Sequence, residues 1–215
     1  MHPFYNFLTR LSDNQLPGEA AQVKLLPRPQ GQEIIRPLFS DKGGYPSAVL
    51  IPLYPGPDEK DMNVILTLRA KSIRHAGQIS FPGGRKEGNE SLECTALRET
   101  HEEIGIDPDL IRIARPITPL YLERTNHQIQ PFVGFLKERP SMKREPDEVE
   151  EVITLPLDQL RDKKFKKRET WDLNKVSFTV PFWDIHPIPL WGATAMIMSE
   201  LLDLYTTFLM NQKHL

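Results

Sequence analysis

The pattern of apolar and polar positions predicts three helices in this chain. Near the start, apolar residues recur at helical spacing, at Phe4, Phe7, Leu8 and Leu11. A second helix is predicted over residues 91–104, with Asn89 or Ser91 as the capping residue at its start. Gly105 follows this helix, where a left-handed residue commonly ends one. A last helix is predicted over residues 193–210, whose apolar stripe is typical of a core-facing surface.

Between these helices, short runs of β-branched and aliphatic residues predict strands. They lie at residues 48–53, 63–69, 111–117, 131–136, 152–153 and 176–180. Strands and helices mix without regular βαβ alternation, which favours an α+β arrangement with helices packed on a mixed β-sheet. The basic run at 161–168 is expected to form a loop or an exposed helix. We expect residues 1–45 to be an N-terminal extension with a short helix, and residues 46–215 to form the main domain.

The composition narrows the classes of partner. The chain has 215 residues, and its 27 basic and 29 acidic residues give a net charge of −2. This balance argues against a nucleic-acid partner or an anionic membrane, because both favour a basic excess. No apolar run reaches the length of a signal peptide or a membrane span, so a cytoplasmic location is expected. The single cysteine, Cys94, excludes a cysteine-based zinc cluster, and we expect it to be buried as a small apolar group.

Three carboxylates gather on one face of the helix predicted over residues 91–104. At about 100° per residue, Glu99, Glu102 and Glu103 fall within an arc of about 100°. Their repulsion destabilises the helix unless a cation offsets it, and hard divalent cations such as Mg²⁺ take oxygen ligands of this kind. A charge run usually forms a solvated helix face. The spacing of the acidic residues therefore has to distinguish a metal site from such a face.

That spacing resembles the Nudix box of a family of pyrophosphohydrolases. The box consists of a glycine, a glutamate, an Arg-Glu pair, a Glu-Glu pair, a second glycine and an apolar residue at fixed intervals. The residues in register are Gly84, Glu90, Arg98, Glu99, Glu102, Glu103, Gly105 and Ile106. Thr100 stands where the family prefers a bulky aliphatic residue, and its methyl group preserves packing. The resemblance implies a Nudix-type α/β/α sandwich with a mixed sheet.

The resemblance also implies which residues bind metal. Glu99, Glu102 and Glu103 resemble the metal-binding glutamates of the family, with Mg²⁺ or Mn²⁺ as the cofactor. Gly83 resembles the residue whose carbonyl contacts a metal. Three further residues of the motif, Gly84, Glu90 and Gly105, are expected to be structural.

For catalysis, the resemblance leaves two candidates for the general base. Glu99 is one, and Arg98 resembles the arginine that orients the catalytic glutamate. Glu148 is the other, because it precedes an apolar run and is expected on a loop near the cleft. Several acids surround Glu148 in the sequence, so a solvated position is an equal alternative.

The segment before the box resembles the motif of coenzyme A pyrophosphatases. It covers residues 66–70 and 74–84, and only two residues separate Arg74 from Gly77 where that family has three. This resemblance implies hydrolysis of coenzyme A or its derivatives to 3′,5′-ADP and a 4′-phosphopantetheine product. Arg69, Arg74 and His75 are then candidate substrate contacts, because such side chains bind phosphate oxygens.

Two other functions stay open on the sequence alone. One is a Nudix pyrophosphatase of another nucleoside diphosphate derivative, such as ADP-ribose or a dinucleotide. The other is a catalytically silent nucleotide-binding module, against which the intact acidic box argues. In each case the expected partner is a small molecule, with no nucleic acid and no membrane, and a homodimer is compatible with the sequence. The basic run at 161–168 either contacts a ribose phosphate or is a solvated loop, which is the more common outcome.

Overall fold

The computed structural model describes residues 2–31, 43–58, 61–71, 77–173 and 175–212. Within these residues the main sheet has eight strands. They are β2 (Tyr45–Pro55), β3 (Met62–Arg69), β4 (Ile79–Ser80), β5 (Gly83–Arg85), β6 (Arg112–Pro116), β7 (Leu120–Leu122), β8 (His127–Phe135) and β9 (Val149–Pro156). The central order is β4-β3-β2-β8-β6, with β5 paired to β2, β7 to β8 and β9 to β3. Strands β2 and β8 run parallel and the other pairs run antiparallel, so the predicted mixed sheet is confirmed.

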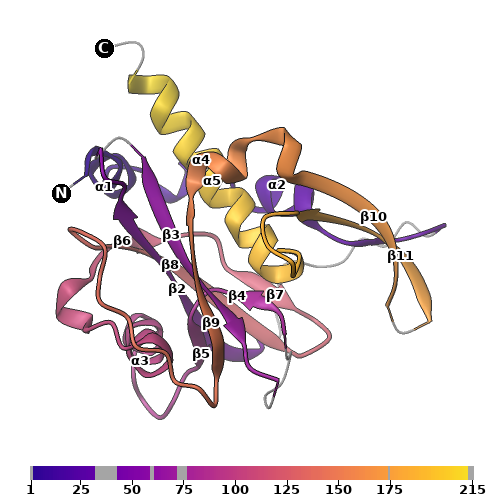
Figure 1. Cartoon of the computed structure of the whole chain (residues 1–215), viewed down its shortest axis with the longest axis horizontal. Coiled ribbons are helices and arrows are strands. Elements are labelled where there is room, and N and C mark those ends of the chain that lie inside the picture. The colour runs from indigo at the N-terminus through magenta and orange to yellow at the C-terminus, as the bar shows by residue number, and fades with distance from the viewer. Residues whose placement is uncertain (1, 32–42, 59–60, 72–76, 174, 213–215) are drawn as a thin grey trace.

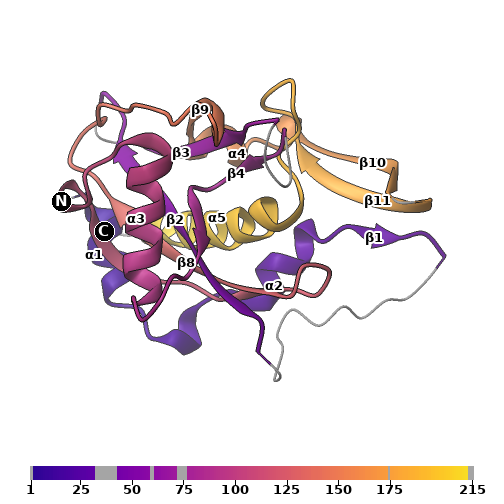
Figure 2. The ribbon, with the colours of Figure 1, turned by 90° about the horizontal axis from the view of Figure 1, so that it is seen from below.

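Helices cover both faces of this sheet (Figures 1 and 2). The α-helices are α1 (Pro3–Thr9), α2 (Gly18–Gln22), α3 (Leu92–Ile104), α4 (Leu157–Arg161) and α5 (Gly192–Gln212). Short 3₁₀ turns lie at Asp13–Gln15, Val23–Leu25, Pro108–Leu110 and Lys163–Phe165. Of the helices described, none is long and apolar enough to cross a membrane. The cytoplasmic location stays a prediction.

Strand β2 shows how one sheet serves two cores. Successive side chains of a strand point to opposite faces. Ala48 and Leu50 are buried in the core beneath α3, whereas Ile51 and Leu53 are buried in the larger core beneath α1 and α5. The nearly unbroken apolar sequence of β2 therefore follows from its burial on both faces, and the α+β class with helices on both sides is confirmed.

Helix α3 begins and ends as its sequence predicts. The Ser91 Oγ accepts a hydrogen bond from the Cys94 N–H at 3.1 Å, and Gly105 closes the helix with a left-handed φ of 71°. Thr100 is fully buried and its hydroxyl donates to the Ala96 carbonyl at 2.7 Å, so it packs where an aliphatic residue would. The expectation that Cys94 is buried is wrong, because it lies in the first turn on the side facing solvent.

A second, smaller sheet corrects the expectation for the basic run. It consists of β1 (Arg28–Pro29), β11 (Val176–Trp183) and β10 (Lys166–Leu173). The expectation of a loop or an exposed helix over residues 161–168 is therefore wrong for the last three of these residues, which begin β10. Lys166 pairs with Trp183 and Arg168 with Pro181, so hydrogen bonding to a neighbouring strand overrides the polar composition.

The N-terminal residues pack on the C-terminal ones. The Phe4 ring lies 5.1 Å from that of Tyr205 and 5.2 Å from that of Phe208, both on α5. Strand β1 pairs with β11. We propose that residues 1–45 and the domain after them fold as one unit. The division of the chain near residue 45 stays a prediction.

A buried carboxylate on α5 reinforces this packing. Glu200 is fully buried and accepts hydrogen bonds from the Thr118 hydroxyl at 2.6 Å and the Gln22 amide at 3.0 Å. The Gly18 N–H donates to it at 3.3 Å. Burial raises the pKa of Glu200 above its ordinary value, although these hydrogen bonds oppose the increase. The network joins α2 and the segment before β7 to the last helix.

Candidate active site

Arg98 is the centre of an ion-pair network on α3. Its guanidinium donates to both carboxylate oxygens of Glu90, from Nε at 3.1 Å and from Nη2 at 2.9 Å. Its Nη1 donates to Glu99 at 3.0 Å and to Glu102 at 2.8 Å. One planar cation thus holds three carboxylates in place, which a lysine could not do with the same geometry. The carboxylates of Glu90, Glu99 and Glu102 are therefore held around one guanidinium, and Glu103 lies outside this network.

Glu90 connects this network to the loop before α3. Its Oε1 accepts hydrogen bonds from the Glu87 N–H at 2.9 Å and from the Thr95 hydroxyl at 2.8 Å. The Arg98 hydrogen bonds, followed by that of Glu87, lower the pKa of Glu90 to about 2. Glu90 is therefore ionised in the ordinary pH range, where it holds the loop against the helix.

Glu99 lies against the glycine that begins the box. A Cβ at Gly84 would lie 2.4 Å from the Glu99 carboxylate, so any larger residue there would displace this carboxylate from its present position. Burial raises the pKa of Glu99, and the adjacent Arg98 opposes that increase. Gly83 is equally constrained, because its φ is 154° and a Cβ there would collide with the Ala48 carbonyl. The two glycines thus bring the β5 backbone close to the acidic face.

Glu103 is the most buried acid of the face, with 3% of its surface exposed. Its Oε1 lies 3.8 Å from the Arg69 Nη1, whereas its buried Oε2 has no hydrogen-bond partner among the described residues. Burial raises the pKa of Glu103 to about 8, although Arg69 and a hydrogen bond from the Gly83 backbone act in the opposite direction. A buried oxygen without a partner is costly, and a bound cation would satisfy it.

Glu148 belongs to the same electrostatic cluster. Its side chain is exposed on a turn just before β9, and its negative charge raises the pKa of both Glu99 and Glu103. Its carbonyl accepts from the Ala70 N–H at 2.9 Å, which attaches the turn to the end of β3. Glu151 points elsewhere, because its carboxylate accepts a hydrogen bond at 3.2 Å from His186.

The acidic side chains do not yet converge on a common point. Within the described ranges, no three His, Cys, Asp or Glu side chains are placed to hold one ion together. Glu99 and Glu102 both face Arg98 instead. Small rotations about their side-chain bonds would turn these two carboxylates toward Glu103, since all three lie on one helix face.

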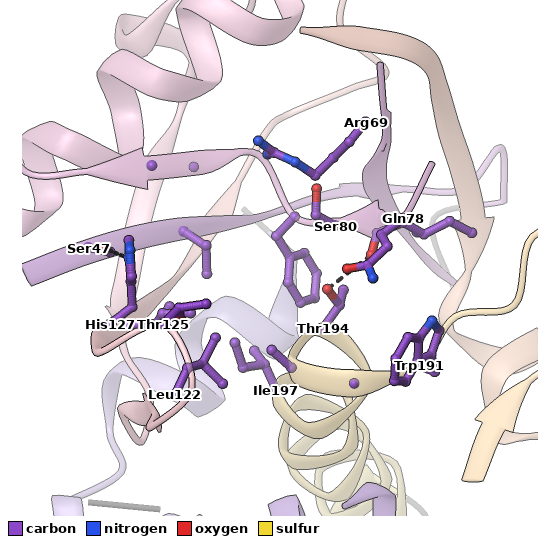
Figure 3. Close-up of a pocket in the computed structure, with 18 of the residues that line it drawn as sticks. Ser47, Arg69, Gln78, Ser80, Leu122, Thr125, His127, Trp191, Thr194 and Ile197 are labelled. Carbon is purple, nitrogen blue, oxygen red and sulfur yellow. Dashed lines mark hydrogen bonds between the residues drawn. The ribbon is translucent and has the colours of Figure 1, made fainter. Parts of the chain in front are cut away.

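A pocket of about 850 Å³ lies beside the acidic face (Figure 3). Arg69, Gly83 and Gly84 line it and connect it to Glu103 and Glu99. Figure 3 shows Trp191 on one side of the pocket and His127 on the other, with α5 residues between them. The volume suits a nucleotide derivative of drug-like or greater size.

Some predicted site residues lie elsewhere. Arg74 and His75 fall outside the described residues. The basic run at 161–168 contributes no lining residue to the pocket, so the alternative in which it contacts a substrate phosphate loses its support. Sequence reasoning missed Trp191, Ser47 and His127, because they come from separate elements and belong to no single motif.

A pH effect on stability follows from the burial of Glu103. In the metal-free protein its pKa is about 8, against 4.5 for an unburied glutamate. The folded state therefore binds more protons than the unfolded state between these values, so the free energy of unfolding falls as the pH rises from about 5 to about 8. Glu103→Gln cannot ionise and avoids this loss. Chemical denaturation in excess chelator should show its advantage over the native protein growing by at least about 1 kcal/mol across this window.

The exposed Glu93 of the same helix offers the matched control, since Glu93→Gln should follow the native protein at every pH. A difference between Glu103→Gln and the native protein that stays constant from pH 5 to pH 8 would contradict the raised pKa.

Comparisons with known proteins agree with this geometry. A family model described as "NUDIX domain" matches residues 44–174. The chain is 32% identical over 178 residues to "Nudix hydrolase 15, mitochondrial" of Arabidopsis thaliana, an alignment that covers 78% of this chain and 62% of that protein. It is 32% identical over 174 residues to "Uncharacterized Nudix hydrolase NudL" of Salmonella dublin, covering 79% of this chain and 88% of the relative.

Solved structures show the same fold. A crystal structure of a Nudix hydrolase from M. smegmatis, RenU, superposes with a TM-score of 0.56 at 18% identity. The superposition covers 79% of this chain and 94% of that one. At this identity the likeness concerns the fold, and the chemistry has to be argued from the residues of the site.

Proposed function

The chain belongs to the NUDIX family, and from this premise we propose that it is a metal-dependent hydrolase that cleaves the pyrophosphate bond of coenzyme A or a derivative. The products are 3′,5′-ADP and a 4′-phosphopantetheine product. The observation that carries the proposal is the buried Glu103 Oε2, which has no hydrogen-bond partner among the described residues and lies beside a pocket of about 850 Å³. Such a position suits a cation that acts on a nucleotide in that pocket.

The residues present fit a divalent cation. Glu99, Glu102, Glu103 and the Gly83 carbonyl are the proposed ligands, and all supply the oxygen atoms that Mg²⁺ and Mn²⁺ prefer. When bound, the cation would neutralise charge on the pyrophosphate and activate water. Burial and neighbouring negative charges raise the pKa of Glu99 and of Glu103. A bound cation would offset both effects, because it stabilises the ionised carboxylates.

The remaining residues of the cluster take positioning and proton-transfer roles in this proposal. Arg98 orients Glu99 and Glu102, which it contacts directly. Glu148 accepts a proton from the attacking water, with Glu99 as the alternative base. Gly84, Glu90 and Gly105 keep the loop, the helix and its end in place, in agreement with their contacts.

Coenzyme A is proposed as the substrate because of the residues before the box. Arg69 lines the pocket next to Glu103, where a guanidinium can contact a pyrophosphate oxygen. Arg74 and His75 remain proposed substrate contacts on the resemblance alone. The pocket also has room for ADP-ribose or a dinucleotide, so these are the substrates against which coenzyme A has to be compared.

A substrate panel tests the proposal. Purified protein with Mg²⁺ or Mn²⁺ is incubated with coenzyme A, ADP-ribose and a dinucleotide polyphosphate, and products are separated by chromatography. We expect kcat/KM for coenzyme A to exceed that of the other two by at least about tenfold, with 3′,5′-ADP released. A preference for ADP-ribose or the dinucleotide would show that coenzyme A is not the substrate. The proposal of metal-dependent pyrophosphate hydrolysis would still hold. Binding without turnover of any of the three would identify a silent module.

A further inference from the structure

We propose that one side of the pocket is a binding site for a phosphate monoester carried by the substrate, separate from the pyrophosphate that is cleaved. The site consists of Ser47, Arg85, Arg124, Thr125 and His127, which all line the pocket. It rests on the proposed function in that the substrate is a nucleoside diphosphate derivative, and it adds that the nucleoside carries a further phosphate.

Strand pairing brings these residues together. Ser47 of β2 lies opposite Arg85 of β5 in the antiparallel pair, and Tyr45 of β2 lies opposite His127 of β8 in the parallel pair. Directly opposed residues on paired strands project from the same face. The first residues of β2 and β8 and the last residue of β5 therefore meet at one edge of the sheet.

Tyr45 contacts two of these side chains. The Arg85 guanidinium lies 4.1 Å from the centroid of the Tyr45 ring, and the His127 ring meets the same ring edge-on at 5.8 Å. The His127 Nδ1 is 2.7 Å from the Ser47 hydroxyl. Stacking and hydrogen bonding restrict both side chains before any ligand binds, and this lowers the entropic cost of binding.

The turn between β7 and β8 adds Arg124 and Thr125, and it is attached firmly to β2. The Tyr45 N–H donates to the Asn126 carbonyl at 2.6 Å. A Cβ on Gly44 would lie only 2.9 Å from that carbonyl, so glycine permits the close approach. Arg124 and Thr125 thereby line the same pocket as Arg85 and His127.

The chemistry of this edge suits a phosphate monoester. Arg85 and Arg124 have the planar donor geometry that matches phosphate, and the two hydroxyls can donate as well. The acid among the lining residues, Asp172, lies on the Trp191 side, because its neighbour Trp171 contacts Trp191 at 5.3 Å. Figure 3 shows Trp191 across the pocket from Ser47, Thr125 and His127. Negative charge is therefore favoured at one side of the pocket.

The length of β5 indicates where on the substrate this phosphate sits. Gly83 and Gly84 mark the cleavage position next to Glu99 and Glu103, and Arg85 follows directly. At roughly 3.3 Å per residue, Arg85 lies about 7 Å along the strand from Gly83. That span fits a phosphate on the ribose of the same nucleotide and is short for a group at the far end of an extended arm.

The test compares substrates that differ only in this phosphate. We measure kcat/KM for coenzyme A and for 3′-dephospho-coenzyme A with the native protein, Arg124→Gln and Arg168→Gln. Arg124 lies on an exposed turn, so its replacement should leave the fold intact. The ratio of the two values should fall roughly 10- to 100-fold in Arg124→Gln, the scale of a hydrogen bond to a charged group. Arg168, on β10, does not line the pocket, and its variant should keep the native ratio.

Calorimetry in excess chelator provides a second measurement that is independent of turnover. Adenosine 3′,5′-bisphosphate should bind the native protein more tightly than adenosine 5′-monophosphate, and Arg124→Gln should remove most of that difference. If coenzyme A is cleaved but neither measurement depends on Arg124, the phosphate site is wrong and the proposed function stands. If coenzyme A is not cleaved while the bisphosphate still binds through Arg124, the phosphate site is supported and coenzyme A is ruled out as the substrate. An equal loss in Arg168→Gln would also overturn the site, because the effect would then be one of overall charge.

Discussion

Glu103→Gln is expected to raise the concentration of Mg²⁺ or Mn²⁺ needed for half-maximal hydrolysis by more than about 100-fold. Residues that only support a metal ligand cost roughly 10- to 100-fold when replaced, and a ligand itself should cost more. The expectation rests on the Glu103 Oε2, which is buried without a partner in the described part of the chain. An amide in its place loses the charge that attracts the cation. Excess chelator should reduce the native protein to the same inactive state, and added Mg²⁺ or Mn²⁺ should restore it.

Two controls separate this effect from unfolding. Glu93→Gln removes an exposed charge from the same helix and should need no more metal than the native protein. The metal-free melting temperature of Glu103→Gln should equal or exceed the native value, because glutamine stays uncharged in this buried position without having to take up a proton. A large decrease in that melting temperature would identify Glu103 as a structural residue, and full turnover in excess chelator would rule out a metal-dependent reaction.

Glu148→Gln is expected to reduce turnover by roughly 10²- to 10⁴-fold, the usual contribution of a general base. Its negative charge adds to the effect of burial in raising the pKa of Glu99 and of Glu103, so Glu148 lies within electrostatic range of both. The same change at Glu151 should have little effect, because that carboxylate accepts a hydrogen bond from His186 instead. Steady-state kinetics at saturating metal make the comparison.

The metal dependence of the Glu148 variant shows which role it has. A lower kcat with an unchanged metal requirement indicates a base, whereas a higher metal requirement indicates a ligand. Small and equal effects of Glu148→Gln and Glu151→Gln would remove Glu148 from the site. Glu99 would then be the favoured base.

The sequence was most informative where spacing alone determines position. The helix predicted over residues 91–104 has its cap at Ser91, one of the two residues expected there, and the expected left-handed Gly105. Both follow from local backbone chemistry, which does not depend on the rest of the fold. The mixed sheet was predictable because a purely parallel sheet is typical of regular βαβ alternation, which this sequence lacks.

What the sequence could not provide depends on tertiary contacts. The pairing of Arg69 with Glu103 joins β3 to α3, and no spacing in the sequence indicates it. The start of β10 lies in a basic run whose polarity suggests a loop, yet pairing with β11 makes it a strand. Tyr45 and His127 are more than 80 residues apart in sequence and become neighbours only through the parallel pairing of β2 with β8.

The contacts of the N-terminal residues bear on the order in which the chain acquires its structure during synthesis. Phe4 packs on Tyr205 and Phe208, and Gln22 hydrogen-bonds Glu200. These partners are translated long after Phe4 and Gln22, because 178 positions separate Gln22 from Glu200. Contacts between residues so far apart in sequence have a high entropic cost of closure and form slowly. The α5 core can therefore be completed only once α5 has been synthesised, and until then the first helix is without the aromatic residues on which it packs.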